Sequence, residues 1–384
     1  MLRRKVTLIR PANEFHKTKE TIFKNFMSGG CNLQFTSLSL PLPTLMKPIQ
    51  QLYPELQLPR KVVITMHQKP DPDAMGSSLG LYHFLIQFGH DVTVISPTNW
   101  PDFLNWMPGC KQVLDYEAHK ETADTLLDET DWLFCLDFNA LYRTRKMAAK
   151  LESIQAVKIM LDHHEEPQTS VFQYGISVIP KSSTAEMIYD FIVDSGHAEK
   201  INTAIAQCLY AGVMSDTGSF RFPVTTPSVH SMVAALKHTG FNHSKVHEEI
   251  NDNFLENRLR FLGHVLSNRM EVYYEYNTAL IYIPKSDILR FHIRTGDTEG
   301  IVNYPLSIKG IRFAALLIDR DEERRWSFRS KDEFDCNSFA RKHFDGGGHF
   351  NAAGGRSGES IDENIRRFKE ALKEYNFELK PNHP

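Results

Sequence analysis

The sequence predicts an α/β protein with a larger N-terminal parallel-sheet domain, a smaller C-terminal α/β domain and a cleft between them. A length of 384 residues gives room for two domains of the usual size, about 150 residues each. From about residue 60 onward, short apolar stretches alternate with longer amphipathic ones, which is the pattern of strands joined by helices. After about residue 235 a charged stretch separates this series from a second set of apolar runs.

The larger domain is expected to begin with a β-branched strand at residues 61–66 and a helix at residues 77–88. Gly89 ends this helix in the position that C-terminal glycines favour. Further apolar runs follow at residues 91–96, 132–136, 157–161 and 204–214. Four of the five runs, all except 91–96, are followed by an acidic or histidine-bearing turn. In an open parallel sheet such turns meet along one crevice, where ligands bind.

The second half starts with a charged stretch, residues 243–273, that is predicted to be helical and to connect the domains. Its leucines recur at three- and four-residue spacing, at Leu255, Leu259, Leu262 and Leu266. Strands are expected at residues 278–283, 312–318 and 325–329, followed by a helix and a glycine-rich loop at 345–349. The predicted division is an N-terminal, poorly ordered extension at 1–54, a catalytic domain at 55–237, a helical connector at 238–273 and a substrate-binding domain at 274–384.

Composition excludes several classes of protein. A formal net charge of −3 provides no broad basic surface for long nucleic acid. The five cysteines have no CxxC spacing, which fits neither a disulfide framework nor a thiolate zinc site. No apolar run approaches the roughly 18 residues of a membrane span, and the basic N-terminus lacks the apolar core of a secretory signal. We therefore expect a cytoplasmic protein without a membrane partner.

The turns after the apolar runs gather carboxylates and imidazoles. Each turn alone has an ordinary explanation: HxxxDxD as a proline turn, an aspartate as a helix cap, adjacent histidines as surface residues. Together they bring five aspartates into one crevice, where like charges repel unless cations offset them. Oxygen ligands with a minority of histidine nitrogen suit Mn²⁺ or Mg²⁺ better than structural zinc. Six candidate ligands favour two ions about 3.5–4 Å apart that share one carboxylate, an arrangement suited to attack on a phosphoryl group.

The same residues resemble a known family. HQKPDPDAMGS at residues 67–77, Asp137, DHH at residues 162–164 and Asp216 are similar to the four ordered motifs of the DHH phosphoesterases. GGGHFNAAG at residues 346–354 resembles the GGGH motif of the DHHA1 domain. The resemblance extends from about residue 55 to about residue 375. Residues 299–305 and 327–330 are most similar to the bifunctional oligoribonucleases that also dephosphorylate 3′-phosphoadenosine 5′-phosphate.

This resemblance implies two manganese ions, with Mg²⁺ or Co²⁺ as alternatives. By similarity, one ion would be held by His67, Asp71 and Asp137. The other would be held by Asp73, Asp137, His163 and Asp216, so that Asp137 bridges the two ions. His164 would stay free of metal and donate a hydrogen bond or proton to the phosphate, and Asp162 would orient a neighbouring histidine; these two are the predicted catalytic residues. The predicted substrate-binding residues are Arg329, Ser330, Gly346, Gly347, Gly348 and His349.

The predicted function is hydrolysis of short RNA oligonucleotides to mononucleotides and of 3′-phosphoadenosine 5′-phosphate to AMP, by two-metal activation of water. The main alternative is a stand-alone phosphodiesterase of cyclic or linear dinucleotides. A single-strand exonuclease would need a basic channel, a pyrophosphatase would lack the GGGH loop, and an inactive nucleotide-binding regulator would be expected to have lost a ligand. The sequence leaves a homodimer, the polarity of attack and the preferred substrate open.

Overall fold

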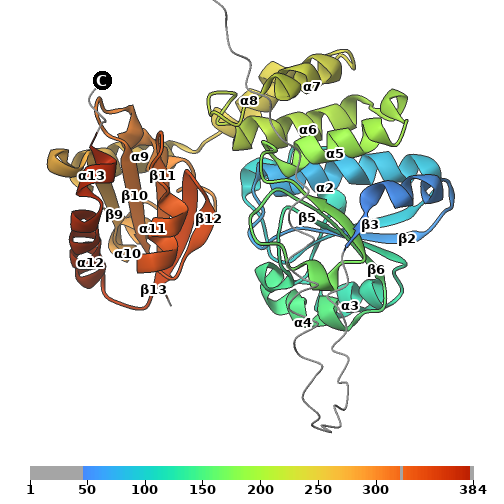
Figure 1. Ribbon diagram of the computed structural model, residues 1–384, viewed down its shortest axis with the longest axis horizontal. Helices are drawn as coiled ribbons and strands as arrows, with labels where there is room; N and C mark the ends of the chain where they lie inside the picture. Colours follow the sequence, from blue (N-terminus) through green and yellow to red (C-terminus); the bar gives the residue numbers. More distant parts are fainter. Residues whose placement is uncertain (1–45, 321–322, 381–384) are drawn as a thin grey trace, which may run out of the picture. The chain divides into compact units, whose positions relative to one another are not determined.

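The computed structural model describes residues 46–320 and 323–380, and Figure 1 shows its elements. The first sheet has seven strands, all parallel, in the order β1-β7-β6-β5-β2-β3-β4. These strands are β1 (Lys47–Pro48), β2 (Lys61–Thr65), β3 (Asp91–Ser96), β4 (Leu114–Asp115), β5 (Trp132–Leu136), β6 (Val157–Asp162) and β7 (Tyr174–Ser177). The parallel sheet and a separate, smaller mixed sheet confirm the predicted fold class.

Helices cover both faces of the first sheet, because successive side chains of a strand point to opposite faces. On β2, Ile64 enters one core and Val63 the other. Figure 1 shows α2, α5 and α6 on one side of this sheet and α3 and α4 on the other. The helices of this part are α2 (Pro72–Leu85), α3 (Lys120–Asp128), α4 (Ala148–Ser153), α5 (Thr184–Asp194), α6 (Thr203–Asp216), α7 (Pro227–Lys237) and α8 (His243–Asn251).

Short 3₁₀ helices join these elements. They are η1 (Ile49–Gln57), η2 (Ile86–Phe88), η3 (Asp102–Leu104), η4 (Cys110–Gln112), η5 (Leu141–Met147), η6 (Thr169–Val171), η7 (Ala198–Lys200), η8 (Tyr274–Tyr276) and η9 (Ile301–Ser307). The first of them buries Ile49, Leu52 and Leu56 in the core. The expected boundary at residue 54 therefore falls inside a packed segment, and residues 1–45 of the expected extension lie outside the described residues.

The apolar run at residues 204–214 is not a strand, contrary to the expected series of strand ends. It forms helix α6, which is buried on nearly every side. A helix that is apolar all round belongs inside a protein, and α6 packs against α2, α5 and α7. Helix α2 in turn begins at Pro72, earlier than the predicted start at residue 77, because Asp71 caps it by accepting from the backbone N–H groups of Asp73 and Ala74. As predicted, Gly89 ends the helical stretch, with φ of 81°.

The second sheet has six strands in the order β12-β13-β11-β10-β9-β8 and is mixed, since only β9 and β10 are parallel. Its strands are β8 (Met270–Tyr273), β9 (Thr278–Ile283), β10 (Phe313–Asp319), β11 (Arg324–Ser330), β12 (Gly347–His349) and β13 (Ala352–Ser357). One face packs aromatic residues under α11 (Cys336–His343) and α12 (Ile361–Glu374), and α13 (Asn376–Leu379) follows. The other face of this sheet packs against α9 (Glu256–Asn268). Helix α10 (Lys285–Arg290) follows β9 in the chain.

Two expectations for this half need correction. The stretch 243–273 is not one helix, since α8 and α9 are followed by β8, which pairs with β9. The leucine spacing identified the buried face of α9 only in part. Leu262 and Leu266 pack against the core around Phe261 and Val265, but Leu255 and Leu259 are each 58% exposed. The glycine-rich loop is also partly a strand, because Gly347–His349 pair with β13. Within the described residues, no helix is long and apolar enough to cross a membrane.

Candidate metal centre

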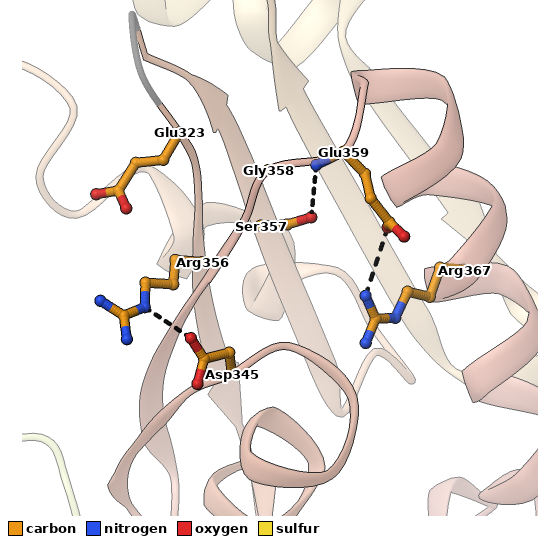
Figure 2. A pocket seen from close by; sticks show the side chains of 7 residues that line it. All are labelled: Glu323, Asp345, Arg356, Ser357, Gly358, Glu359 and Arg367. Atoms are coloured by element: carbon orange, nitrogen blue, oxygen red, sulfur yellow. Dashed lines mark hydrogen bonds and ion pairs between the residues drawn. The ribbon is translucent and has the colours of Figure 1, made fainter.

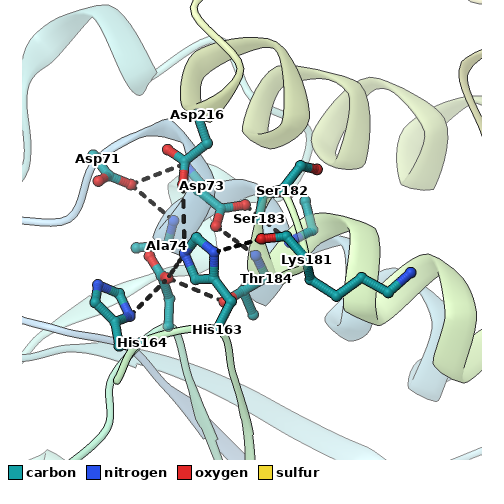
Figure 3. Close-up of polar contacts among 12 residues, drawn as sticks. Asp71, Asp73, Ala74, His163, His164, Lys181, Ser182, Ser183, Thr184 and Asp216 are labelled. Carbon is teal, nitrogen blue, oxygen red and sulfur yellow. Dashed lines mark hydrogen bonds and ion pairs between the residues drawn. The ribbon is translucent and has the colours of Figure 1, made fainter. Parts of the chain in front are cut away.

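The candidate site lies where the first sheet changes the direction of its strand order. From β2 the chain first adds β3 and β4 on one side and then β5, β6 and β7 on the other. Open parallel sheets bind ligands at the carboxyl ends of strands at such a switch point. The predicted residues follow three adjacent strands and one helix: His67, Asp71 and Asp73 after β2, Asp137 after β5, Asp162, His163 and His164 at the end of β6, and Asp216 at the end of α6. Figure 3 shows the side chains of Asp71, Asp73, His163, His164 and Asp216 directed toward one another.

Asp137 is the centre of the cluster. Its carboxylate lies 3.3 Å from Nε2 of His67 and 3.5 Å from Nε2 of His163, and it also accepts a hydrogen bond of 3.0 Å from the hydroxyl of Thr184. The residue is only 2% exposed, and its φ of 62° is in the left-handed region that few residues other than glycine adopt. Backbone strain of this kind is often kept where a side chain must point in a fixed direction.

The histidines each use one ring nitrogen to fix the direction of the other. Nδ1–H of His67 donates to the carbonyl of Gln68 at 2.8 Å, and Nδ1–H of His163 donates to the carbonyl of Lys181 at 3.2 Å. In both rings Nε2 is left facing carboxylates, which is how a metal-binding histidine is usually oriented. His163 Nε2 lies 3.5 Å from Asp216 as well.

Asp73 is fixed by the N-terminus of helix α5. The backbone N–H groups of Thr184 and Ala185 donate to its two oxygens at 2.7 and 2.9 Å. Gly212 on α6 makes room for it, because a Cβ at that position would lie 2.7 Å from Oδ1 of Asp73. The carboxylate is fully buried.

The electrostatics of the cluster call for added positive charge. Burial, followed by the neighbouring carboxylates of Asp137 and Asp216, raises the pKa of Asp73 well above its usual value. Burial and Asp71 do the same to the pKa of Asp216. Burial alone would also raise the pKa of Asp137, but hydrogen bonds from His163 and His67 outweigh it and hold that pKa low.

The donor set fits two divalent cations. Ligand atoms of His67, Asp71 and Asp137 lie within 4.8 Å of one another, and so do those of Asp73, Asp137 and His163. The two groups share Asp137, the residue that the resemblance predicts as the bridge. Among the described residues, the ion pairs of Asp71, Asp137 and Asp216 are with histidines and not with lysine or arginine. Divalent cations would supply the missing charge.

His164 and Asp162 form a separate pair beside the cluster. Nδ1–H of His164 donates to Oδ1 of Asp162 at 2.7 Å. Asp162 is fully buried, so it is not a surface carboxylate. The pair leaves Nε2 of His164 without a hydrogen-bond partner among the described residues, and ligand atoms of His164 also lie within 4.8 Å of those of Asp137 and Asp162.

The second sheet brings His349 to this pair. The ring centroid of His349 lies 4.5 Å from that of His164 and 4.8 Å from that of His163. Burial, followed by the positive charges of His164 and His163, lowers the pKa of His349 to about 3. His349 is therefore neutral at physiological pH and retains one N–H donor.

The other predicted substrate contacts have different surroundings. Arg329 is half-buried and donates to its neighbour's carbonyl; burial lowers its pKa, against the charges of Cys336, Asp216 and Asp71. The hydroxyl of Ser330 is engaged elsewhere, since it donates to the carbonyl of Phe334 and accepts from Asn351. The Ser330 hydroxyl therefore has no hydrogen left to donate to a substrate.

Gly347 and Gly348 lie in strand β12 and Gly346 directly precedes it, so the three glycines do not form a flexible turn. A Cβ on Gly346 would meet the Gly354 carbonyl at 2.1 Å, and one on Gly348 would meet the Ala352 carbonyl at 2.5 Å. The space beside Gly347 is more open, with its nearest neighbours 3.7 and 3.8 Å away. The backbone N–H of Gly348 is already bonded to Asn337 Oδ1 at 2.9 Å.

Three residues of the site were missed from the sequence. Thr184 donates hydrogen bonds to Asp73 and Asp137. The sequence STAE at residues 183–186 predicts the start of a helix, but it does not indicate which residues that helix start contacts. Desolvation and then Asp71 raise the pKa of Glu299 to about 8, although part of the residue is exposed. Glu299 begins the stretch 299–305 that carries the family resemblance but was not assigned to the site. Asn337 bonds Gly348 from helix α11, and no local pattern indicated it.

A hollow on the second sheet carries no comparable chemistry. Its lining includes Arg356 and Arg367, which pair with Asp345 at 2.7 Å and Glu359 at 3.4 Å, as Figure 2 shows. Glu323 also lines the hollow and pairs with Arg325. Since every cation of the lining is already paired, we assign it no ligand.

Comparisons with known families agree with this architecture. The model of the DHH family, N-terminal domain, matches residues 61–213, which include five of the six candidate ligands and end three residues before the sixth, Asp216. The model of the DHHA1 domain matches residues 279–376, which include Arg329 and the glycine strand.

Individual relatives extend over most of the chain. A crystal structure of an exopolyphosphatase-related protein from Bacteroides fragilis is 39% identical, with a TM-score of 0.82 over 86% of this chain and 97% of that one. The bifunctional oligoribonuclease and PAP phosphatase NrnA of Bacillus subtilis is 28% identical over 296 residues, 76% of this chain and 88% of that protein. The cyclic-di-AMP phosphodiesterase GdpP of B. subtilis is 24% identical over 331 residues, 82% of this chain and 48% of that protein.

Proposed function

The chain belongs to the DHH family of phosphoester hydrolases and carries a DHHA1 domain, and on this premise we propose that it cleaves short RNA oligonucleotides to mononucleotides. We propose 3′-phosphoadenosine 5′-phosphate, converted to AMP, as a second substrate. The name of the Bacillus subtilis relative, an oligoribonuclease and PAP phosphatase, supports both substrates. The preferred cation in this proposal is Mn²⁺, with Mg²⁺ or Co²⁺ as alternatives.

The observation that carries the proposal is that two groups of candidate metal ligands share Asp137. The contacting rings of His164 and His349 lie beside these groups, and Arg329 is close enough to feel the charges of Asp71 and Asp216. The ligand groups His67/Asp71/Asp137 and Asp73/Asp137/His163 are assigned to the two cations, with Asp216 completing the second group through its position 3.5 Å from His163. When bound, such a pair of cations supplies an activated water and positive charge at a phosphoryl group.

The chain's own residues have distinct tasks in this proposal. His164, oriented by Asp162, donates a hydrogen bond or proton from Nε2 to a phosphoryl oxygen, where negative charge grows during hydrolysis. His349, neutral and in contact with the His164 ring, contributes a second donor. The planar guanidinium group of Arg329 donates two parallel hydrogen bonds to a phosphate of the substrate. Binding by side chains of both sheets favours a short substrate whose ends are both near the site.

A side-by-side hydrolysis assay tests the proposal. Purified protein with Mn²⁺ would be given 5′-labelled RNA dimers to pentamers, 3′-phosphoadenosine 5′-phosphate, dinucleotides and pyrophosphate, each also with Mg²⁺ and with Co²⁺. We expect mononucleotides from the RNA, AMP from the bisphosphate and no turnover of pyrophosphate. Failure to release mononucleotides from any RNA oligomer with all three cations would overturn the oligoribonuclease assignment.

A second candidate is a phosphodiesterase of cyclic or linear dinucleotides. It is favoured by the similarity to the cyclic-di-AMP phosphodiesterase GdpP, which spans 82% of this chain. The same assay separates the two functions, because this candidate requires turnover of a cyclic dinucleotide at a higher kcat/KM than that of an RNA trimer. We propose the cytoplasm as the location, where free thiols such as the four buried described cysteines remain reduced.

A further inference from the structure

Asn337 on helix α11 connects the two sheets through its side-chain amide. Its Nδ2 donates to Oε2 of Glu165 at 2.9 Å, and its Oδ1 accepts from the N–H of Gly348 at 2.9 Å and from Nε of Arg341 at 3.1 Å. The residue is only 5% exposed. Each polar atom of the amide is therefore engaged in a buried position, where an unmade hydrogen bond is costly.

Both partners of Asn337 adjoin the candidate site in sequence. Glu165 directly follows His164, and Gly348 directly precedes His349. The rings of His164 and His349 are in contact, with centroids 4.5 Å apart. One amide thus joins the residue after one histidine to the residue before the other.

Hydrogen bonds from Asn139 fix the position of Glu165. The amide of Asn139, two residues after Asp137, donates to the carbonyl of Glu165 at 2.7 Å, and the carbonyl of Asn139 accepts from the N–H of Gln168 at 2.7 Å. Glu166 has φ of 55°, so the chain turns sharply at this point. The carboxylate of Glu165 is therefore presented on a turn that is tied to the metal-binding segment.

A neighbouring ion pair between the same elements contributes less. Arg341 Nη1 lies 2.8 Å from Oε2 of Glu166, but the two side chains are 40% and 70% exposed. Exposed ion pairs contribute little, because water and salt screen them, whereas a partly buried hydrogen bond to a charged carboxylate contributes more. The Asn337–Glu165 bond is thus the stronger connection of the two.

We propose that Asn337 is a positioning residue that holds His349 against His164, by bonding Glu165 on one side and Gly348 on the other. The proposal rests on the proposed function of the site as a phosphoester hydrolase. It adds a residue outside the metal ligands and outside the glycine strand to the set that determines how tightly substrate is bound. Loss of the hydrogen bond between Asn337 and Glu165 separates His349 from His164 and raises KM for phosphoester substrates.

Asn337→Asp is the informative variant. An aspartate keeps the oxygen that accepts from Gly348 and Arg341, and near the start of α11 its charge favours the helix. It removes the donor to Glu165 and places a second carboxylate against it. We expect KM for the RNA dimer to rise roughly tenfold, with a smaller change in kcat and a Tm lowered by only a few degrees.

A second substitution reverses the roles of donor and acceptor. In the double variant Asn337→Asp/Glu165→Gln, the glutamine amide donates to the new aspartate, and we expect KM to return to near the wild-type value. Asn253→Asp is the matched control, since Asn253 Nδ2 also donates to a glutamate, Glu249, at 2.9 Å, but on the exposed surface of the α8 region. This control should leave KM unchanged.

Hydrogen exchange of the full-length protein with Mn²⁺ and without substrate provides an independent readout. We expect faster exchange in peptides that contain residues 163–166 and 347–349 of Asn337→Asp, and recovery in the double variant. Wild-type KM and exchange in Asn337→Asp, or no recovery in the double variant, would show that Asn337 does not position His349. An inactive wild type would instead overturn the proposed function, and the exchange data would still test the positioning role.

Discussion

At the scale of single residues, the pair of adjacent histidines shows how hydrogen bonds divide two identical side chains between two tasks. Nδ1 of His163 is bonded to a backbone carbonyl, so its Nε2 faces the carboxylates. Nδ1 of His164 is bonded to Asp162, so its Nε2 is left for a substrate. The partner of each ring, and not the ring itself, determines the proposed role.

Replacing Asp162 by asparagine tests this division. The amide keeps the shape of the side chain but weakens the acceptor for Nδ1–H of His164, so the ring loses its fixed tautomer. We expect kcat for an RNA dimer to fall roughly 10–100-fold, the range found when the orienting partner of a histidine is removed, while KM changes little. Steady-state kinetics checks this, with the exposed Asp194→Asn as the control. An unchanged kcat would argue against the orienting role.

At the scale of elements, helix α6 determines how closely the acidic turns approach one another. Its glycine at 212 lies under Asp73, and Gly76 of α2 lies against its backbone, where a Cβ would meet the Cys208 carbonyl at 2.4 Å. The helices can approach this closely only because both positions lack a side chain. The position of Asp73 therefore depends on helix packing as well as on its own turn.

Gly212→Ala should push Asp73 away from the cluster. We expect weaker Mn²⁺ binding by isothermal titration calorimetry and a loss of about 1–3 kcal/mol of unfolding free energy, since a methyl group must be forced into a packed site. Gly263→Ala is the matched control, because Gly263 also lies inside a helix and a Cβ there meets nothing within 4 Å. The unfolding free energy of this control should rise by about 0.5–1 kcal/mol. Equal Mn²⁺ affinity in wild type and Gly212→Ala would contradict this account.

A buried carboxylate connects α9 to α10. Asp287 accepts from Nε of Arg269 at 2.6 Å and from Nε2 of His264 at 3.1 Å, and it is 4% exposed. Burial would raise its pKa, but Arg269 and His264 outweigh this and lower it. A lowered folded-state pKa means that the stabilisation is present above the unfolded carboxyl value of about 3.9 and is lost as pH falls through the folded one.

We therefore expect Asp287→Asn to lower the unfolding free energy by about 1–3 kcal/mol at pH 7. The difference between wild type and variant should shrink as the pH falls below about 4. Urea denaturation of both proteins at pH 7 and at pH 3 measures it. A difference that stays constant between the two pH values would show that this carboxylate does not titrate with folding.

The elements also show what the sequence could and could not predict. The bounds of the strands predicted at residues 61–66, 91–96 and 132–136 agree with the structure to within one residue. A short apolar run between two polar turns is too short for most helices, so a strand is the favoured structure. The run at 204–214 was misassigned because a wholly apolar stretch has no periodicity to separate a helix from a strand. The candidate ligands could be proposed from the sequence, since each follows an apolar run, whereas Thr184 and Asn337 reach the site only through the packing of distant segments.

At the scale of the whole molecule, metal binding should be coupled to the stability of the fold. The proposed ligands come from loops after β2, β5 and β6 and from α6, which unfolding would separate. A cation that binds only the folded chain stabilises it by about 2.7 kcal/mol at a concentration of 100 times its Kd. The site is thus expected to act as a cross-link between the central strands and α6.

Thermal unfolding in the presence of Mn²⁺ and of a chelator tests this coupling without any substrate. We expect Mn²⁺ to raise the Tm of the wild type by several degrees, as a gain of a few kcal/mol implies, and the chelator to reverse the effect. Asp137→Asn, which removes the shared ligand, should lose most of the Mn²⁺-dependent shift. The same shift in wild type and variant would rule out Asp137 as a bridging ligand.

The first sheet ends on both sides in very short strands. At one edge, β1 consists of Lys47 and Pro48, and at the other, β4 consists of Leu114 and Asp115. A two-residue edge offers almost no free ladder of N–H and C=O groups to another chain, and lysine and proline at an edge discourage pairing further. The buried central strands β2, β5 and β6 thus lie away from both edges of the sheet, and the edge strands β1 and β4 themselves give a second copy of the chain little backbone to pair with.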